Sequence, residues 1–226
     1  WRYTLQHEDG SIVNFSEKDL EKYLKEGKGI GFNGLFTSKD QANKRVEEFK
    51  EKISTDTDRV LGETIDYVLE PQVSFVLMDP HTGEVLALTG GRGEKKQSKT
   101  LNRASNVYRQ PGSTFKVVSS FAPAIDLYGA TLASTYYDSE YTVGNKTFKN
   151  WYSGGYLGYQ SIRDGIVYSL NIVAVRCLME TVKPERGYEY AKSLGISSLV
   201  EDDKNPALAL GGLTKGVSNL ELTQAY

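Results

Sequence analysis

This 226-residue sequence has few of the side chains that build metal centres and disulfides. It contains one cysteine, Cys177, and two histidines, His7 and His81. A single cysteine excludes an internal disulfide, and the lack of a Cys/His cluster argues against a metal site. We therefore expect neither a metal ion nor another cofactor, and we expect Cys177 to be a small buried hydrophobic residue.

The sequence also lacks an excess of charge and any long apolar run. The formal net charge is -2 at pH 7, which predicts no nucleic-acid partner and no attraction to an anionic membrane surface. No apolar run approaches the roughly 20 residues that span a bilayer. There is no signal peptide, and the sequence opens on Trp1 rather than on Met. We interpret the chain as a piece of a longer polypeptide whose membrane anchor, if it has one, lies outside these residues.

Residues 1–70 are expected to form a separate small α/β module with a linker or docking role. The alternation in residues 1–5 and 11–15 predicts a hairpin around Asp9-Gly10, and an amphipathic helix is expected over residues 17–25. Gly27, Gly29, Gly31 and Gly34 indicate a loop. The Ser-Lys-Asp-Gln pattern at residues 38–41 is a capping box that predicts a helix to about residue 53. A further short strand or helix is expected over residues 60–69.

Residues 71–226 are expected to form the main domain. Residues 73–78 are typical of a buried strand, and a turn at residues 79–83 leads to a second strand over residues 84–89. The glycine-rich basic loop at residues 90–99 is no phosphate-binding loop, because no Gly-Lys-Ser/Thr follows it. Another hairpin is predicted at residues 141–148. Helices are predicted from Ser113, from Ser161, over residues 172–179, over residues 185–194 up to Gly195, and from a capping box at Ser218.

The stretch with the most chemical information is residues 109–116, Arg-Gln-Pro-Gly-Ser-Thr-Phe-Lys. Pro111-Gly112 predicts a helix start near Ser113, and on a helix Ser113 and Lys116 lie on one face. The apolar residues that follow indicate a buried helix. Burial and the positive helix start both disfavour a second positive charge, so Lys116 can lose its proton and act as a base on Ser113. This is an activated nucleophile without histidine, although the spacing alone also fits a solvated helix face.

Aromatic residues gather in the sequence around the hairpin predicted at residues 141–148. Such a cluster can line a cleft, and it can equally pack around a loop, so both interpretations stay open. The residues are Tyr136, Tyr137, Trp151, Tyr152, Tyr156 and Tyr159.

A second short pattern, Ser169-Leu170-Asn171, follows the first, and each pattern occurs once in the chain. Ser-x-x-Lys followed by Ser-x-Asn is the opening signature of the penicillin-recognising serine acyltransferases. Residues 79–85, 102–104, 109–116 and 208–212 all resemble class A penicillin-binding proteins, the bifunctional peptidoglycan synthases of bacteria, and clostridial-type members in particular. The similarity covers roughly residues 71–226, while residues 1–70 resemble the linker region between that family's two catalytic domains.

The resemblance implies an α+β transpeptidase fold in which an antiparallel sheet packs with helices. It implies that Ser113 attacks the carbonyl between the two D-alanines of a peptidoglycan stem peptide and that Lys116 takes its proton. Ser169 is implied to relay a proton to the leaving D-alanine, and Asn171 to bind the substrate amide and help fix Lys116. The implied partners are stem peptides, lipid II and β-lactam antibiotics. The implied location is the extracellular face of the bacterial cytoplasmic membrane, where the parent protein is anchored.

The sequence departs from the family pattern at its C-terminal end. The third motif, Lys-Thr/Ser-Gly on a strand, is absent, and Thr214-Lys215-Gly216 has the wrong order and leads into a helix. We expect the domain to be incomplete at this end, with that motif beyond Tyr226. The fragment alone is then expected to be inactive or nearly so, unless the missing C-terminal part of the domain binds to it. The glycosyltransferase half is absent as well.

Three other functions fit parts of the pattern. A class A β-lactamase shares the first two motifs, but no Glu-x-x-Leu-Asn element is present. A penicillin-sensing receptor domain uses the same serine to signal. A purely structural or interaction fragment is the third, and penicillin labelling of Ser113 separates it from a working enzyme.

Overall fold

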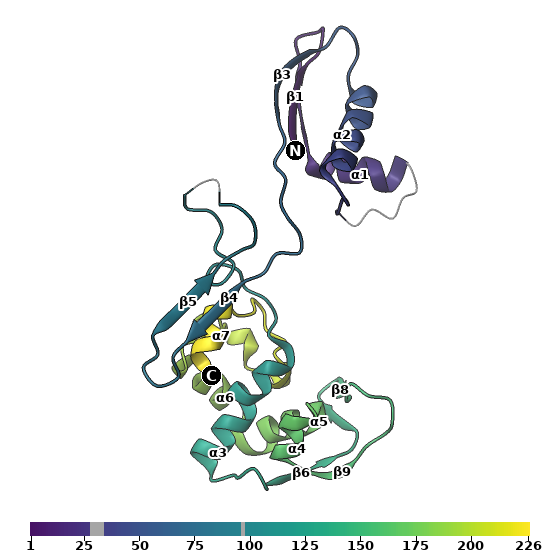
Figure 1. Ribbon diagram of the computed structural model, residues 1–226. Helices are drawn as coiled ribbons and strands as arrows, with labels where there is room; N and C mark the ends of the chain where they lie inside the picture. The colour runs from purple at the N-terminus through teal and green to yellow at the C-terminus, as the bar shows by residue number, and fades with distance from the viewer. Residues whose placement is uncertain (28–33, 96–97) are drawn as a thin grey trace. The chain divides into compact units, whose positions relative to one another are not determined.

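The computed structural model describes residues 1–27, 34–95 and 98–226. The chain forms two compact units, Trp1–Pro71 and Gln72–Tyr226 (Figure 1). Gly29 and Gly31 of the predicted glycine loop lie outside the described residues, as does part of the loop predicted at residues 90–99. No helix in the described ranges has both the length and the apolar character to cross a membrane.

The first unit is a three-stranded antiparallel sheet with two helices, in which β1 lies between β2 and β3. The predicted hairpin is confirmed, with Tyr3 opposite Phe15 and Leu5 opposite Val13. Gly10 takes a φ of 84° in its turn. The region predicted as a short strand or helix after the second helix is a strand. The elements are β1 (Arg2–Gln6), β2 (Ile12–Ser16), α1 (Glu17–Gly27), α2 (Lys39–Ile53) and β3 (Arg59–Thr64).

The helix predicted from Ser38 forms, but its capping box is incomplete. The Ser38 hydroxyl accepts a hydrogen bond from the Gln41 N–H at 3.1 Å. The Gln41 side chain accepts from the Thr37 N–H at 2.8 Å, so it reaches one residue beyond the position that the box requires. The apolar faces of α1 and α2 form the core of this unit, which is built around Leu20, Leu24, Val46 and Phe49.

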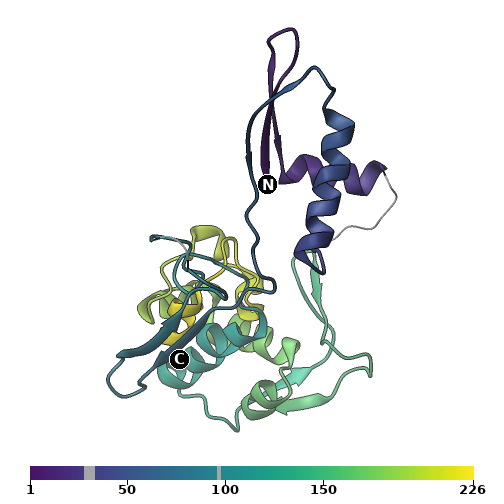
Figure 2. The ribbon, with the colours of Figure 1, turned by 45° about the horizontal axis from the view of Figure 1, so that its top comes forward.

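The second unit packs helices around one core and carries three two-stranded antiparallel sheets in its described part, β4–β5, β6–β9 and β7–β8. α4 lies beside β9, and α5 beside β6 (Figures 1 and 2). The elements are β4 (Phe75–Met78), β5 (Val85–Thr89), η1 (Gly112–Thr114), η2 (Val117–Phe121), α3 (Ala122–Tyr128), β6 (Thr135–Asp138), β7 (Tyr141–Val143), β8 (Lys146–Phe148), β9 (Gly158–Ser161), α4 (Ile162–Val167), α5 (Asn171–Arg176), η3 (Cys177–Val182), α6 (Pro184–Ser193), η4 (Glu201–Asp203), η5 (Pro206–Leu210) and α7 (Asn219–Ala225).

The β4–β5 hairpin confirms both predicted strands and corrects their predicted burial. Phe75 pairs with Thr89 and Val76 with Leu88 across the hairpin. α7 packs against β4, yet Phe75 is 53% exposed and Leu77 47% exposed. The prediction of a buried strand is therefore wrong for the described chain. An apolar run marks a strand that can be covered, but it does not say which layer covers it.

Most of the predicted caps and turns in this unit are confirmed. Ser161 and Asp164 form a capping box at the start of α4, and Ser218 and Glu221 form another at the start of α7. Gly195 follows α6 with a φ of 96°. The β7–β8 hairpin forms as predicted, and Cys177 is fully buried.

The two central helices differ from prediction because each contains a π-helical segment. In η2 the Ala122 N–H donates to the Val117 carbonyl, five residues back. Pro123 has no N–H to give to the Ser119 carbonyl, so regular α-helical bonding cannot run through this point. The helix predicted over residues 172–179 is α5 followed by the π-helix η3. These helices carry Lys116 and Asn171 at their first turns.

Candidate active site

Ser113 lies in η1, a single 3-10 turn that a distant segment holds in place. Arg109 and Val217 exchange two backbone hydrogen bonds of 2.9 and 2.8 Å. The Gln110 side chain accepts from the Leu213 N–H at 2.7 Å and donates to the Leu213 carbonyl. Residues 213–217 therefore fix the backbone immediately before Ser113.

Gly211 packs directly against this turn and has a φ of 69°. A Cβ at Gly211 would lie 2.3 Å from the Gly112 carbonyl oxygen and 2.7 Å from its nitrogen, so only glycine fits there. The following Thr214-Lys215-Gly216 segment lies on no named strand, as predicted. Instead, the buried Asp203 carboxylate accepts from the Thr214 N–H at 2.7 Å and from its hydroxyl at 2.8 Å.

Lys116 is 2% exposed and its amine makes three hydrogen bonds to two residues. Nζ donates to the Ser169 carbonyl at 2.6 Å, to the Ser169 hydroxyl at 2.9 Å and to Asn171 Oδ1 at 2.7 Å. The structure thus brings together three of the four predicted site residues. None of these acceptors is charged, and burial lowers the pKa of Lys116 to about 8.

The left-handed backbone of Ser169 makes this arrangement possible. Ser169 has a φ of 52°, a conformation that costs a residue with a side chain roughly 1–2 kcal/mol. The neighbouring Leu170 is fully buried and donates its N–H to the Gly165 carbonyl at 3.0 Å. The surrounding packing therefore holds the strained residue, whose carbonyl and hydroxyl both reach Lys116.

The hydrogen-bonding pattern limits what the amine does in each protonation state. A charged amine has three protons and no acceptor site, so the three contacts satisfy it fully. A neutral amine has two protons and one lone pair. Of its three partners only the Ser169 hydroxyl can donate to that lone pair, because carbonyl and amide oxygens only accept. Ser169 is therefore placed to exchange a proton with Lys116.

Ser113, Lys116 and Ser169 line one cavity of about 330 Å³. Ser113 is exposed, and within the described residues its hydroxyl makes no hydrogen bond. No hydrogen bond joins Ser113 to Lys116 in the described structure, although both line this cavity. Ser113 belongs to the first turn of a helix, where N–H groups have no intrahelical acceptor and can bind a developing negative charge. The other lining residues are Thr114, Val117, Phe121, Gly165, Ile166 and Tyr226.

The predicted aromatic cluster does not line this cavity. Tyr136 is buried, and Tyr137 and Tyr159 contact each other with ring centroids 4.9 Å apart. Trp151 donates its indole N–H to the Tyr168 carbonyl at 3.0 Å. Of the two open interpretations, packing fits these contacts better than lining this cavity, and the Tyr137–Tyr159 pair packs across strands β6 and β9.

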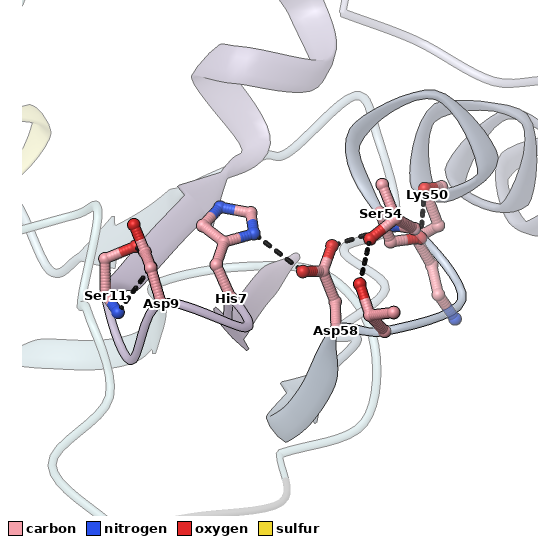
Figure 3. Close-up of polar contacts among 8 residues, drawn as sticks. His7, Asp9, Ser11, Lys50, Ser54 and Asp58 are labelled. Atoms are coloured by element: carbon pink, nitrogen blue, oxygen red, sulfur yellow. Dashed lines mark hydrogen bonds and ion pairs between the residues drawn. The ribbon is translucent and has the colours of Figure 1, made fainter.

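A polar cluster in the first unit was not singled out by the sequence (Figure 3). His7 Nδ1 lies 2.8 Å from the Asp58 carboxylate. The nearby Ser11 hydroxyl donates to Asp9 at 2.6 Å, so it is engaged away from His7 and the three side chains form no Ser-His-Asp relay. Asp58 also accepts from the Thr55 N–H at 2.8 Å. The cluster ties the end of β1 to the loop before β3.

Sequence reasoning also missed Asn150, which contacts the start of α5. Its Oδ1 accepts from the Asn171 N–H at 2.9 Å and from the Ile172 N–H at 3.2 Å. The backbone carbonyl of the preceding residue, Lys149, accepts from Asn171 Nδ2 at 2.9 Å. No spacing rule links a loop asparagine to a helix start about 20 residues later, so only the tertiary structure finds this contact.

Residues 73–221 match the family described as "Penicillin binding protein transpeptidase domain". Penicillin-binding protein 1A of Clostridium botulinum (strain Langeland / NCTC 10281 / Type F) is 34% identical over 172 residues, which cover 70% of this chain and 20% of the relative. Penicillin-binding protein 1F of Bacillus subtilis (strain 168) is 41% identical over 153 residues, which cover 68% of this chain and 20% of the relative.

The penicillin-binding protein PonA1 from Mycobacterium tuberculosis has a solved structure that is similar to this chain. The TM-score is 0.56 at 25% identity, and the match covers 68% of this chain and 40% of that one. This chain spans 20% of the length of each of the two curated relatives.

Proposed function

Since the chain belongs to the transpeptidase domain family of penicillin-binding proteins, which act in peptidoglycan synthesis, we propose that Ser113 is its acylated nucleophile. The proposed reaction is D,D-transpeptidation of stem peptides that end in D-Ala-D-Ala. Ser113 Oγ forms an ester with the carbonyl carbon of the penultimate D-alanine, and the bond from that carbon to the terminal D-alanine nitrogen breaks. An amine of a neighbouring stem peptide then displaces Ser113 and forms the cross-link.

Lys116 is the proposed base of both half-reactions. It accepts the Ser113 proton as the oxygen attacks, and that proton leaves with the D-alanine amine. Ser169 is proposed to carry the proton between Lys116 and the leaving nitrogen. In the second half-reaction the incoming amine loses its proton along the same route, and Ser113 regains it. Asn171 is proposed to hold Lys116 and to bind the substrate amide, and the Ser113 N–H supplies one oxyanion donor.

One observation carries the proposal: Lys116 is almost fully buried against neutral acceptors in the cavity that Ser113 also lines. A lysine without a carboxylate partner, whose pKa lies at about 8, has an accessible neutral form near physiological pH. Such a group supports acid–base work, whereas a structural lysine is stabilised as a cation by opposite charge.

Intact mass spectrometry after incubation with benzylpenicillin tests this assignment. We expect one adduct with the mass of the intact antibiotic, because opening the lactam ring adds the whole molecule to Ser113. Ser113→Ala should lose the adduct completely, while Ser105→Ala, a serine outside the cavity, should keep it. An adduct that survives in Ser113→Ala would reject Ser113 as the nucleophile. In a longer polypeptide that includes the family's Lys-Thr/Ser-Gly motif, an adduct without any turnover of stem peptides would favour a penicillin-sensing role.

We further propose that these 226 residues alone react slowly, because the family's Lys-Thr/Ser-Gly motif is not among them. That motif is expected to supply a substrate-carboxylate clamp and a second oxyanion donor. One missing oxyanion donor costs about 10²–10³ in rate. The acylation rate constant of this chain, compared with that of a longer polypeptide including the motif, should differ by this factor. Equal rate constants would contradict the proposal.

The wider context is also a proposal. We propose that the first unit acts as a linker or docking module. We place the parent protein at the extracellular face of the bacterial cytoplasmic membrane, with stem peptides, lipid II and β-lactams as ligands. The remaining part of the transpeptidase domain is proposed to contact the β4–β5 hairpin. The exposed apolar side chains of this hairpin support the proposal; they are Phe75, Leu77, Val85, Leu86 and Leu88.

A further inference from the structure

Asp138, at the end of β6, is a buried carboxylate that the proposed reaction does not use. It is 1% exposed, and it accepts three hydrogen bonds from uncharged donors. Asn150 Nδ2 donates to Oδ1 at 2.8 Å, while the Tyr152 hydroxyl and the Leu157 N–H each donate to Oδ2 at 3.0 Å. Burying a carboxylate without a cation is costly, and this one is connected to the start of α5 through Asn150, which points to a specific role.

The carboxylate fixes the orientation of the Asn150 side-chain amide. An ionised carboxylate only accepts hydrogen bonds, so it selects the NH₂ end of Asn150 and turns Oδ1 in the opposite direction. Asn150 Nδ2 also donates to the Tyr152 hydroxyl at 2.9 Å, which adds to this selection. Oδ1 then faces the first N–H groups of α5, those of Asn171 and Ile172.

Asn150 thereby acts as an N-cap supplied from another part of the chain. The N-cap residue of α5 is Leu170, which offers no side-chain acceptor. The first N–H groups of a helix need acceptors from outside it, and Asn150 Oδ1 accepts hydrogen bonds from two of these N–H groups. The Lys149 backbone carbonyl accepts from the Asn171 side-chain NH₂ at 2.9 Å. The consecutive residues Lys149 and Asn150 therefore hold Asn171 by its side chain and its backbone together, which leaves Oδ1 for Lys116 Nζ at 2.7 Å.

We propose that Asp138 is a positioning residue for this site: it orients Asn150, which caps α5 and sets Asn171 Oδ1 against the Lys116 amine. This inference rests on the proposed function, in which Lys116 is the base. The alternative is that Asp138 only stabilises the loop over residues 149–157. The two differ in their effect on Lys116, which a loop-stabilising residue would leave unchanged.

The main variant is Asp138→Asn, studied in the intact protein with the benzylpenicillin acylation rate measured between pH 6 and 10. The new side-chain amide at position 138 can donate a hydrogen bond to Asn150 Oδ1. Asn150 is then free to turn its NH₂ group towards α5. We expect the limiting rate to fall at least about tenfold, within the range of coupling energies between contacting residues. We also expect the midpoint of the pH profile to move to lower pH, since a lost acceptor no longer favours the charged amine. Asp202→Asn, at an exposed position, is the matched control and should change neither quantity.

A polarity swap separates positioning from general loss of structure. Asn150→Asp alone places two carboxylates against each other, and its limiting rate should fall further than that of Asp138→Asn. In the double variant Asp138→Asn/Asn150→Asp, the amide at 138 donates to the carboxylate at 150, whose other oxygen can again accept from α5. The double variant should recover to within about threefold of the original rate, because coupled neighbours are not additive. A double variant as slow as the slower single variant overturns the proposal. So does an Asp138→Asn protein that has lower thermal stability but an unchanged acylation rate and an unchanged pH profile.

Hydrogen exchange gives a readout that does not depend on catalysis. The amides of Asn171 and Ile172 should exchange faster in Asp138→Asn, and the double variant should restore their protection. If the unaltered protein forms no penicillin adduct, the proposed function fails for these 226 residues, and these amides alone decide the inference. Unchanged exchange in Asp138→Asn would overturn it.

Discussion

The two units each contain a lysine with little exposure, and their surroundings are opposite in kind. The Lys50 side chain, in the first unit, is 19% exposed and lies 3.0 Å from both Glu47 and Glu63. Burial alone lowers the pKa of Lys50, but hydrogen bonds with the two glutamates outweigh it and raise the pKa above its ordinary value. Lys116, in the second unit, has only neutral acceptors, and burial lowers its pKa to about 8.

The contrast shows that burial by itself does not make a lysine reactive. A lysine paired with carboxylates is held in its charged form and donates hydrogen bonds only. Lys116, which is 2% exposed and meets a carbonyl, a hydroxyl and an amide oxygen, keeps an accessible neutral form. The chemistry therefore follows from burial together with the charge of the partners, and the partners of Lys116 are set by the turn at Ser169 and the start of α5.

The largest expected effect is on the acylation rate when Lys116 is exchanged for methionine, with the same exchange at Lys50 as the comparison. Lys116→Met should lower the benzylpenicillin acylation rate constant by about 10²–10⁴, the usual contribution of a general base. Lys50→Met removes two ion pairs at a partly exposed site and should leave that rate unchanged, with at most about 1 kcal/mol lost in the free energy of unfolding. Time-resolved mass spectrometry gives the rates, and denaturant titration gives the stabilities. A Lys116→Met protein that is acylated at the original rate would remove Lys116 from the mechanism.

The sequence predicted the members of this site because each of its two patterns is local. Ser113 and Lys116 are three residues apart, as one helical turn requires, and Ser169 and Asn171 flank one buried leucine. Their order along the chain resembled one family, and that family assignment and its transpeptidase fold are confirmed by the comparisons. The catalytic roles of the four residues stay predictions: geometry places three of them in contact, while the Ser113 hydroxyl makes no hydrogen bond within the described residues.

What the sequence did not predict depends on tertiary contacts. The Ser169 carbonyl reaches Lys116 only because Ser169 takes a φ of 52°, and serine has no marked preference for that conformation. Asn150 contacts α5 through a loop whose path is set by β7, β8 and Asp138. The exposure of β4 was missed for the same reason, because the apolar run says nothing about its neighbours. Pro123 was the one local sign of the π-helical segment, and its meaning depends on the helix that it follows.

A smaller effect is expected on stability when one glycine of each unit is replaced by alanine. Gly211 and Gly10 have positive φ values of 69° and 84°, but a Cβ at Gly10 has nothing within 4 Å, whereas one at Gly211 meets the Gly112 backbone at 2.3 Å. Gly10→Ala should cost about 1–2 kcal/mol of unfolding free energy from conformation alone. Gly211→Ala should cost about 2–6 kcal/mol, because overpacking adds to strain. It should also slow acylation, since Gly112 moves and Ser113 follows it. Equal losses in the two variants would show that the contact with η1 is unimportant.

The finest test of the comparison is the pH dependence of stability in the alkaline range. The folded-state pKa of Lys116 is below its unfolded value of 10.5, so the unfolded chain binds more protons between about pH 8 and 10.5. Stability must then rise with pH across this window, by up to about 3 kcal/mol for a shift of this size. Lys50 has the opposite sign: its folded pKa is raised, so its contribution is complete below the unfolded pKa and is lost as pH rises through the folded pKa.

Trp1 and Trp151, one in each unit, allow the two effects to be followed separately by fluorescence during denaturant titration. Trp151 in a Trp1→Phe background should report a stability difference between the original protein and Lys116→Met that grows in favour of the original protein from pH 8 to 10. Trp1 in a Trp151→Phe background should report the reverse trend for Lys50→Met at the alkaline end. Taking each difference cancels the tyrosines that titrate in the same range. If both differences moved in the same direction, the charge of the partners would not be what separates the two lysines.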